Sequence, residues 1–240
     1  MDSREKLIVA ADYNPKDFGG KKGVEKEVLN LANILSGLGV YIKINSILRA
    51  IGYQLIDMLH DKGLRVFADL KLIDIPNTME IDACFLKEYK PDLLTVMCSA
   101  GVEGMRRVQE VLPETKVLGV TVLTSLDEED CQAVFTCSTK AGVLRFARMA
   151  KLAKLGDLIL SPKEVDVVKN RRELMLGLNT PGIRPEWAFV DGDDQSRFLT
   201  PFQAIRNGSD RIVVGRPITQ SSDPRDAVLR TIEEIEKGLE

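Results

Sequence analysis

The hydrophobic pattern of the chain alternates between short apolar runs and longer stretches with helical spacing. Short runs of β-branched and aliphatic residues are typical of strands buried in a parallel sheet. We predict strands at Leu7–Tyr13, Val40–Ile44, Arg65–Leu70, Leu93–Met97, Lys116–Leu123, Leu158–Leu160, Leu174–Leu178 and Arg211–Val214. Between them, apolar residues recur three and four positions apart, which predicts helices. These are Val24–Leu35, Ile47–Lys62, Thr78–Glu88, Glu103–Leu112, Leu144–Leu155, Pro162–Lys169, Pro201–Asn207 and Asp223–Leu239.

Strands that alternate with helices indicate βαβ units and therefore a parallel sheet. Eight such units in 240 residues match a (β/α)8 barrel, or TIM barrel, which typically has about 250 residues. A doubly wound open sheet usually has about six strands and a glycine-rich phosphate turn after the first of them. Here the first strand runs into Ala-Asp-Tyr-Asn-Pro instead. We therefore predict an α/β fold in which residues 1–240 form a single (β/α)8 barrel domain.

Two connections are longer than the few residues usual between a strand and the next helix. They are Thr124–Lys140, with the acidic run Asp127–Asp130, and Asn179–Thr200, with several prolines and glycines. Both follow a strand, so a barrel places them at the carboxyl ends of its strands, where active sites lie. We predict both as long loops beside a site.

Composition narrows the class of protein further. Charged residues make up 29% of the chain and hydrophobic residues 44%, which excludes disordered and fibrous classes. The net charge of −3 argues against bulk binding to nucleic acid. No run approaches the roughly 18 apolar residues of a membrane span, and no signal peptide is recognised. We expect a cytoplasmic protein whose partners include neither a membrane nor a nucleic acid.

The chain offers few groups for metal binding or nucleophilic catalysis. Its four cysteines show no paired metal-ligand spacing, and His60 is the only histidine. We predict that the cysteines are reduced and structural, and we expect no metal site. A Ser-His or Cys-His mechanism would depend on His60, which falls near a predicted helix end and is more simply a solvated imidazole. Acid–base chemistry must then use lysines and carboxylates.

The third predicted strand carries the most informative pair of residues. Asp69 and Lys71 are two positions apart, so on a strand they point to the same side. Aspartate is a poor strand former and lysine is seldom buried, so the presence of both in one predicted strand requires a structural or functional explanation. It is either a structural ion pair at the strand end or part of a catalytic site.

Further charged residues follow at the same end of the predicted barrel. Asp74 lies in a tight loop before Pro76, where it is either a turn residue or a carboxylate at the catalytic face. Because proline disfavours helix at the residue before it, Asn77 or Thr78 should cap the next helix. Two earlier strand ends contribute similar groups. Lys43 interrupts an apolar strand and Asp12 ends the first strand; alone, each is more simply a solvated strand end.

The last strand provides a different signal. Gly215 and Arg216 follow its apolar core, where barrels often bind phosphate through backbone N–H groups and a planar guanidinium. Arg184, after the seventh strand, could converge on the same anion. We therefore predict a phosphate site here.

These residues together resemble a known family. Asp69-x-Lys71-x-x-Asp74-Ile-Pro-Asn-Thr78 resembles the signature of the orotidine 5′-phosphate decarboxylases. Other segments are similar to motifs of the bacterial form, and the matches run in order from Asp12 to Thr219. These segments are Gly119–Ser125, Thr180–Pro185, Asp194-Gln195 and Val214–Thr219. The Asp-x-Lys-x-x-Asp core is shared with sister decarboxylases and synthases, whereas the Ile-Pro-Asn-Thr extension is more specific.

The resemblance implies a barrel enzyme, with no cofactor and no metal, that converts orotidine 5′-monophosphate to uridine 5′-monophosphate (UMP) in pyrimidine synthesis. It implies a homodimer with shared active sites. The implied catalytic residues are Lys43, Asp69, Lys71 and Asp74, with Asp74 reaching into the partner's site and Lys71 donating the proton. The implied ribose and substrate contacts are Asp12, Lys43, Thr124 and, from the partner, Thr78. The implied phosphate contacts are Arg184, Gln195, Gly215 and Arg216.

The sequence departs from the family pattern in places that leave every charged member present. The departures are Ala-Ala before Asp12, Leu72-Ile73 after the lysine, the segment Val96–Gly101, and Trp187 and Phe189 before Gln195. Three rival interpretations stay open at this point. One is a metal-dependent sugar-phosphate decarboxylase or hexulose-phosphate synthase; the second is a Schiff-base aldolase that uses Lys43 or Lys71; the third is a barrel that binds a phosphorylated ligand without turnover.

Overall fold

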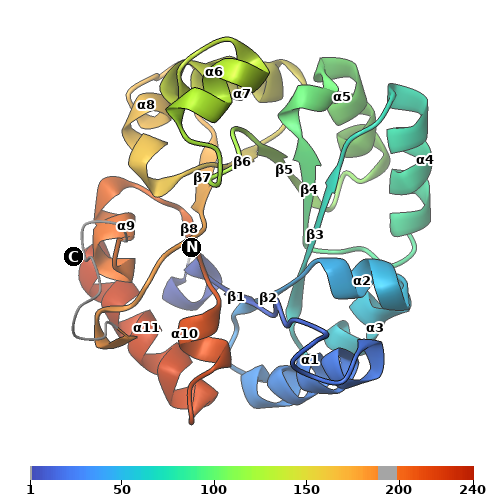
Figure 1. The fold of residues 1–240 in the computed structure, drawn as a ribbon, viewed down its shortest axis with the longest axis vertical. Helices are drawn as coiled ribbons and strands as arrows, with labels where there is room; N and C mark the ends of the chain where they lie inside the picture. Colours follow the sequence, from blue (N-terminus) through green and yellow to red (C-terminus); the bar gives the residue numbers. More distant parts are fainter. Residues whose placement is uncertain (1, 189–198) are drawn as a thin grey trace. The chain divides into compact units, whose positions relative to one another are not determined.

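The predicted barrel is confirmed by the computed structural model, which describes residues 2–188 and 199–240. Eight strands follow one another in sequence order around a closed barrel (Figure 1). They are β1 Leu7–Ala10, β2 Tyr41–Ile44, β3 Arg65–Leu72, β4 Leu93–Met97, β5 Lys116–Val120, β6 Asp157–Ile159, β7 Gly177–Thr180 and β8 Arg211–Val214.

Helices connect the strands in the described ranges. The α-helices are α1 Lys21–Leu35, α2 Ser46–Ile51, α3 Gln54–His60, α4 Pro76–Leu86, α5 Val102–Val111, α6 Glu128–Phe135, α7 Thr139–Leu152, α8 Val165–Lys169, α9 Pro201–Asn207, α10 Arg216–Thr219 and α11 Pro224–Leu239. Four short 3-10 turns accompany them at Ser3–Lys6, Cys98–Ala100, Pro162–Glu164 and Glu186–Ala188. None of the described helices is long and apolar enough to cross a bilayer.

Backbone contacts divide the chain into two compact units. Unit 1 consists of Met1–Leu70, Gly182–Arg206 and Arg211–Glu240, and unit 2 of Lys71–Pro181 and Asn207–Asp210. In unit 1, β1 pairs in parallel with both β2 and β8. In unit 2, β4, β5, β6 and β7 pair in parallel in that order. The prediction that residues 1–240 form a single domain stays a prediction.

The strands form because their side chains are apolar on both faces, as parallel strands covered by helices require. Ile8, Ile42 and Val66 of unit 1 are fully buried, and so are Val96 and Leu158 of unit 2. Burying one such side chain stabilises the fold by roughly 1.5–3 kcal/mol. Polar residues in these strands are therefore exceptions that mark a site or a hydrogen-bonded core position.

One predicted strand was wrong in position. The segment Leu174–Leu178 was predicted from its leucines, but β7 begins only at Gly177 because Met175 takes a left-handed backbone with φ of +43°. The strand then continues through Asn179 and Thr180, which are polar yet fully buried. Asn179 donates to the Leu158 carbonyl at 2.9 Å, and Thr180 donates to the Ser209 hydroxyl at 2.9 Å. These hydrogen bonds make polar residues acceptable there.

One helix prediction and one loop prediction also needed correction. The helix predicted over Ile47–Lys62 is two helices, α2 and α3, because Gly52 between them has φ of +113°, a conformation that suits only glycine. The predicted loop Thr124–Lys140 contains α6. Asp127 starts that helix by accepting a hydrogen bond from the Asp130 N–H at 2.9 Å, so the acidic run is a helix N-terminus.

The predicted cap of α4 was wrong as well. Neither Asn77 nor Thr78 precedes the helix; Ile75 does, and Pro76 occupies the first helical turn. Proline suits that position because its fixed φ is helical and it has no N–H to leave unpaired.

Candidate active site

Three predicted charged residues come together at the carboxyl ends of the unit 1 strands. The Lys43 ammonium on β2 donates to both carboxylate oxygens of Asp12, at 2.8 and 2.9 Å, and to Asp69 Oδ2 at 3.2 Å. Lys43 and Asp69 are each 7% exposed. The parallel register explains the meeting, because Lys43 lies opposite Ala10 on β1 and Phe67 on β3, each two residues before one of the aspartates. Of the two lysines and three carboxylates predicted at these strand ends, Asp12, Lys43 and Asp69 are the ones that these hydrogen bonds join.

A buried lysine between two carboxylates has a clear electrostatic logic. Removing one partner of such a group strands a charge away from water, which costs roughly 3–5 kcal/mol. The charged residues at these strand ends therefore stabilise one another, and none of them is tolerated in the buried site without its partners. Such a set can hold sugar hydroxyls and fix the position of neighbouring charged groups.

Lys71 is conformationally unusual. Its φ is +48°, although it belongs to β3. The other described non-glycine residues with positive φ, namely Lys90, Thr136, Lys154 and Met175, lie outside the strands. The Lys71 N–H donates to Thr95 Oγ1 on β4 at 2.9 Å, and Thr95 is itself buried. The regular alternation assumed for Asp69 and Lys71 therefore stops at Lys71. Such strain, held by a neighbouring strand, is typical of functional positions.

Thr95 was missed by the sequence reasoning. It is 1% exposed within an otherwise apolar strand. A polar residue inside the run Leu93–Met97 was the available signal, because a buried hydroxyl needs a partner.

Asp74 and Thr78 begin the segment that leads into α4. Asp74 is exposed and accepts a hydrogen bond from the Ile75 N–H at 2.7 Å. Burial and, second, the Asp74 carboxylate raise the pKa of Asp82, which lies two turns further along the chain. Thr78 lies in the first turn of α4 and is partly exposed. Asp74 is therefore presented outward from unit 2, free of the core.

The predicted phosphate residues lie at the ends of β7 and β8. Arg216 is exposed at the start of α10, directly after Gly215. Arg184 is partly exposed, and its backbone N–H donates to the Leu199 carbonyl at 3.1 Å. Thr124 is exposed after β5. Gln195 and Phe189 lie outside the described residues, so their predicted places are not tested.

A Cβ on Gly215 would meet Ala10 at 3.6 Å, an ordinary van der Waals distance. Packing against β1 therefore does not require glycine at this position. A ligand that approaches the backbone closely would require it.

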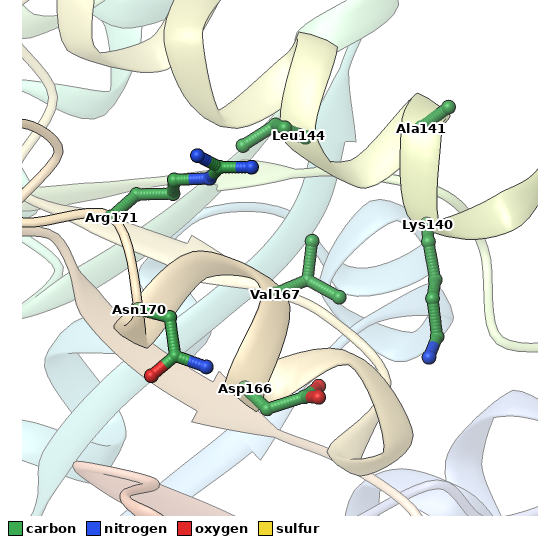
Figure 2. Close-up of a pocket in the computed structure, with 7 residues that line it drawn as sticks. All are labelled: Lys140, Ala141, Leu144, Asp166, Val167, Asn170 and Arg171. Atoms are coloured by element: carbon green, nitrogen blue, oxygen red, sulfur yellow. The ribbon is translucent and has the colours of Figure 1, made fainter.

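An open groove of about 410 Å³ lies elsewhere, between α7 and α8 (Figure 2). Figure 2 shows Lys140, Ala141 and Leu144 on the α7 side, with Asp166, Val167, Asn170 and Arg171 opposite. None of the predicted site residues lines it. Charged, polar and apolar side chains line it together, as in a surface groove between packed helices.

Metal chemistry has no evident centre in the part of the chain that the structure describes. There, no three histidine, cysteine, aspartate or glutamate side chains gather as a metal site would require. The four cysteines are free thiols, of which Cys98 and Cys131 are buried and Cys84 is exposed.

The buried carboxyl group of Glu234 forms a hydrogen bond with the segment that follows Arg184. Glu234 of α11 is 9% exposed, and its Oε1 accepts a hydrogen bond from the Glu186 N–H at 3.0 Å. Its Oε2 is buried and has no hydrogen-bond partner in the described structure. Burial raises the pKa of Glu234 to about 7. Trp187, the only tryptophan, lies in the same turn, with the Arg230 guanidinium 4.9 Å from its ring centroid.

This carboxyl predicts a pH-dependent stability. Because its folded-state pKa lies above the ordinary 4.5, the folded protein binds the proton more tightly than the unfolded chain. The free energy of unfolding should therefore fall as the pH rises from about 4.5 to about 7, and the cost persists above that range. Glu234→Gln should remove this cost and gain about 1 kcal/mol over the wild type near pH 8, with no such gain near pH 5.

Denaturant unfolding at the two pH values checks this prediction. Glu233→Gln, an exposed neighbour on the same helix, is the matched control and should behave as the wild type. Equal effects of Glu234→Gln at both pH values would contradict a titrating carboxyl.

The fold and the charged strand ends define a barrel enzyme with its chemistry at the carboxyl ends of the strands. A family model described as "Orotidine 5′-phosphate decarboxylase / HUMPS family" matches residues 5–231. The chain therefore belongs to the orotidine 5′-phosphate decarboxylase / HUMPS family.

Individual relatives agree with the family match. The orotidine 5′-phosphate decarboxylase of Syntrophus aciditrophicus is 39% identical, with 99% of this chain and 96% of that protein covered. That of Pseudomonas fluorescens SBW25 is 37% identical, with 95% and 97% covered. The crystal structure of the Lactobacillus acidophilus orotidine 5′-phosphate decarboxylase superposes with a TM-score of 0.79 at 29% identity, covering 96% of this chain and 99% of that one. The resemblance seen in the sequence is thereby confirmed.

Proposed function

We propose that this enzyme decarboxylates orotidine 5′-monophosphate to UMP, with Lys71 as the group that stabilises the carbanion and protonates it. The observation that carries the proposal is the set Asp69, Lys71 and Asp74 at the end of β3, in a chain whose relatives at 35–40% identity are named orotidine 5′-phosphate decarboxylases. The activity is that of a carbon–carbon lyase in pyrimidine biosynthesis.

The reaction explains why this lysine is needed. Loss of CO2 leaves an electron pair on a pyrimidine carbon that has no adjacent carbonyl to accept it. Without an electron-sink cofactor, the protein must supply the stabilising charge. An ammonium beside that carbon stabilises the developing negative charge and then donates the proton that replaces CO2.

In the proposed site, the carboxylates of Asp69 and Asp74 hold the Lys71 ammonium in place. Asp69, two residues before Lys71, is itself fixed by the Lys43 ammonium at 3.2 Å. At about 4 Å and an effective dielectric constant near 20, one ammonium–carboxylate pair interacts by roughly 4 kcal/mol. The Lys43 bridge to Asp12 and Asp69 thus supports the proposal of a preorganised site, in which Asp12 and Lys43 also bind ribose hydroxyls.

The phosphate residues have a supporting role. Arg216, the Gly215 backbone and Arg184 are the groups suited to a phosphate among the described residues, and Gln195 is the predicted fourth. The phosphate does not react, but its binding energy can order the charged site, so substrates that lack it should lose turnover as well as affinity.

Arg216→Ala tests the phosphate site. The variant loses a charge-assisted, planar contact and should bind UMP about 10- to 100-fold more weakly. Calorimetric titration with UMP measures this, and titration with uridine, which has no phosphate, should give the same affinity for variant and wild type. Arg172→Ala, an exposed arginine of unit 2, is the control. Unchanged UMP affinity in Arg216→Ala would remove this residue from the site.

A spectrophotometric assay with orotidine 5′-monophosphate tests the proposed function itself. Turnover that persists in the presence of a chelator supports the proposal. Activity that disappears with the chelator, or activity only on sugar phosphates, would instead favour the sister enzymes of the family. Trapping of a covalent lysine adduct by borohydride would favour an aldolase, and UMP binding without turnover a binding protein.

We further propose a homodimer that uses the surface of α4. Four large apolar side chains in this region are exposed in the single chain: Ile73 (57%), Ile75 (65%), Ile81 (47%) and Phe85 (64%). Ile81 and Phe85 are four residues apart and share one face of the helix. Asp74 and Thr78 lie at the start of the same helix, which suits the predicted contribution of both residues to a partner's site.

Phe85→Asp tests this interface. Burying a carboxylate in an apolar contact should raise the dimer dissociation constant by at least about 30-fold. Sedimentation equilibrium measures the change. Phe202→Asp, an exposed phenylalanine on α9, is the matched control and should leave the dimer intact. If Phe85→Asp dimerises as tightly as the wild type, the interface lies elsewhere.

A further inference from the structure

Two of the four cysteines lie together at the end of α6. Cys131 is on the helix and fully buried, whereas Cys137 follows the helix and is partly exposed. A Cβ on Gly142 of α7 would meet the sulfur of Cys137 at 3.5 Å and that of Cys131 at 3.6 Å, so both thiols lie against the same small residue.

The local backbone explains why the thiols meet. Thr136 ends α6 in the left-handed conformation, with φ of +56°, and its N–H donates to the Gln132 carbonyl at 3.0 Å. In this type of helix end, the residue after the left-handed one turns back onto the last turns of the helix. Here the residue after the left-handed one is Cys137, and Cys131 lies in the part of α6 onto which it folds back. A β-branched residue such as threonine is strained in the left-handed region, so the backbone conformation that brings the two cysteines together costs conformational energy.

The segment that carries the thiols is also fastened at its other end. The Thr139 N–H, at the start of α7, donates to Glu128 Oε2 at 3.1 Å, which ties the start of α7 to the start of α6. The folded backbone therefore holds the two cysteines close together.

We propose that Cys131 and Cys137 form a reversible redox site that closes to an intramolecular disulfide when a low-molecular-weight disulfide is present. Cys137 is the entry point because it is the more exposed of the two. Cys131 is the resolving thiol, shielded from direct attack by its burial.

The reaction balances in two exchange steps. The Cys137 thiolate attacks one sulfur of the external disulfide, the S–S bond of that molecule breaks, and one thiol leaves. The Cys131 thiol then loses its proton and attacks Cys137, which releases the second external thiol. The two cysteines lose two electrons and two protons in total, and the external disulfide gains them.

The burial of Cys131 suits its proposed role as the resolving thiol. Burial raises the pKa of the Cys131 thiol, and the neighbouring Cys137 raises it further. A thiol of this kind reacts slowly with reagents in solution but quickly with a sulfur held against it.

The test incubates the whole protein with oxidised glutathione, followed by alkylation and peptide mass spectrometry. The expected product is a cross-linked pair of peptides that contain Cys131 and Cys137, about 2 Da lighter than the reduced pair and restored by a reductant. Cys137→Ser should block it without altering the buried position. Cys84→Ser, which removes the exposed thiol of α4, should leave it unchanged.

Two outcomes would overturn the proposal. One is a glutathione adduct that remains on Cys137 while Cys131 is still alkylated after unfolding. The other is cross-linking through Cys84 alone. The readout is independent of decarboxylation, so failure of the proposed function would leave this result interpretable.

Discussion

Lys71→Ala should abolish decarboxylation and leave UMP binding measurable. The variant removes both the charge that stabilises the carbanion and the proton that completes the reaction. These two contributions are typically about 100-fold or more each, so the expected loss of kcat is at least about 10⁴-fold. UMP carries no group that needs the proton, and the proposed phosphate residues Arg184 and Arg216 are unchanged in the variant. Its dissociation constant should therefore change by less than about tenfold.

The chain offers a matched control for this experiment. Lys90 also has a left-handed backbone, with φ of +45°, and it forms an exposed ion pair with Glu114 at 3.8 Å. Lys90→Ala therefore repeats the backbone effect of the substitution without touching the charged strand ends. Steady-state kinetics and UMP titration of both variants separate chemistry from folding. Turnover by Lys71→Ala within tenfold of the wild type would end the assignment of Lys71.

The strand ends were predictable because their signal is local. A lysine or aspartate in an apolar strand is costly unless it is paired, so Lys43 and Asp69 stood out in the sequence. Their meeting with Asp12 followed from the barrel, since parallel neighbouring strands end at the same rim. The order of the eight strands followed from the same alternation of strand and helix.

Other features depended on contacts that the sequence does not reveal. The end of β7 was misplaced because Asn179 and Thr180 read as a loop until their hydrogen-bond partners are known. The left-handed backbone of Lys71 depends on Thr95 of the neighbouring strand. Nothing in the sequence of the helix predicted over Asp223–Leu239 distinguishes Glu234, whose burial and hydrogen bond to the Glu186 N–H depend on a distant turn.

The prediction that the acidic run Asp127–Asp130 lies in a long loop was wrong for a reason that the sequence explains. Acidic residues after a strand can form a binding loop or begin a helix, and composition alone does not distinguish the two. The distinguishing feature was Asp127 three residues before Asp130, the spacing of a side-chain cap. The consequence is that the substrate residue predicted at Thr124 is followed by a short link and a helix, in place of a long loop.

Mixed dimers should recover activity if each site draws Asp74 from the partner subunit. Asp74→Ala and Lys71→Ala homodimers are each expected to be inactive. In a mixed dimer, the Asp74→Ala subunit keeps its own Lys71 and receives an intact Asp74, so one site of the two is complete. Because one of its two sites is complete, the isolated mixed dimer should recover about half of the wild-type activity.

The control pairs Lys71→Ala with Lys43→Ala. Both lysines are predicted to serve the site of their own subunit, so no site in that mixed dimer is complete and no activity should return. Co-expression with two different affinity tags isolates each mixed dimer before assay. An Asp74→Ala/Lys71→Ala dimer that is confirmed as mixed and is still inactive would show that Asp74 does not cross to the partner's site, because the complete site is built only if it does.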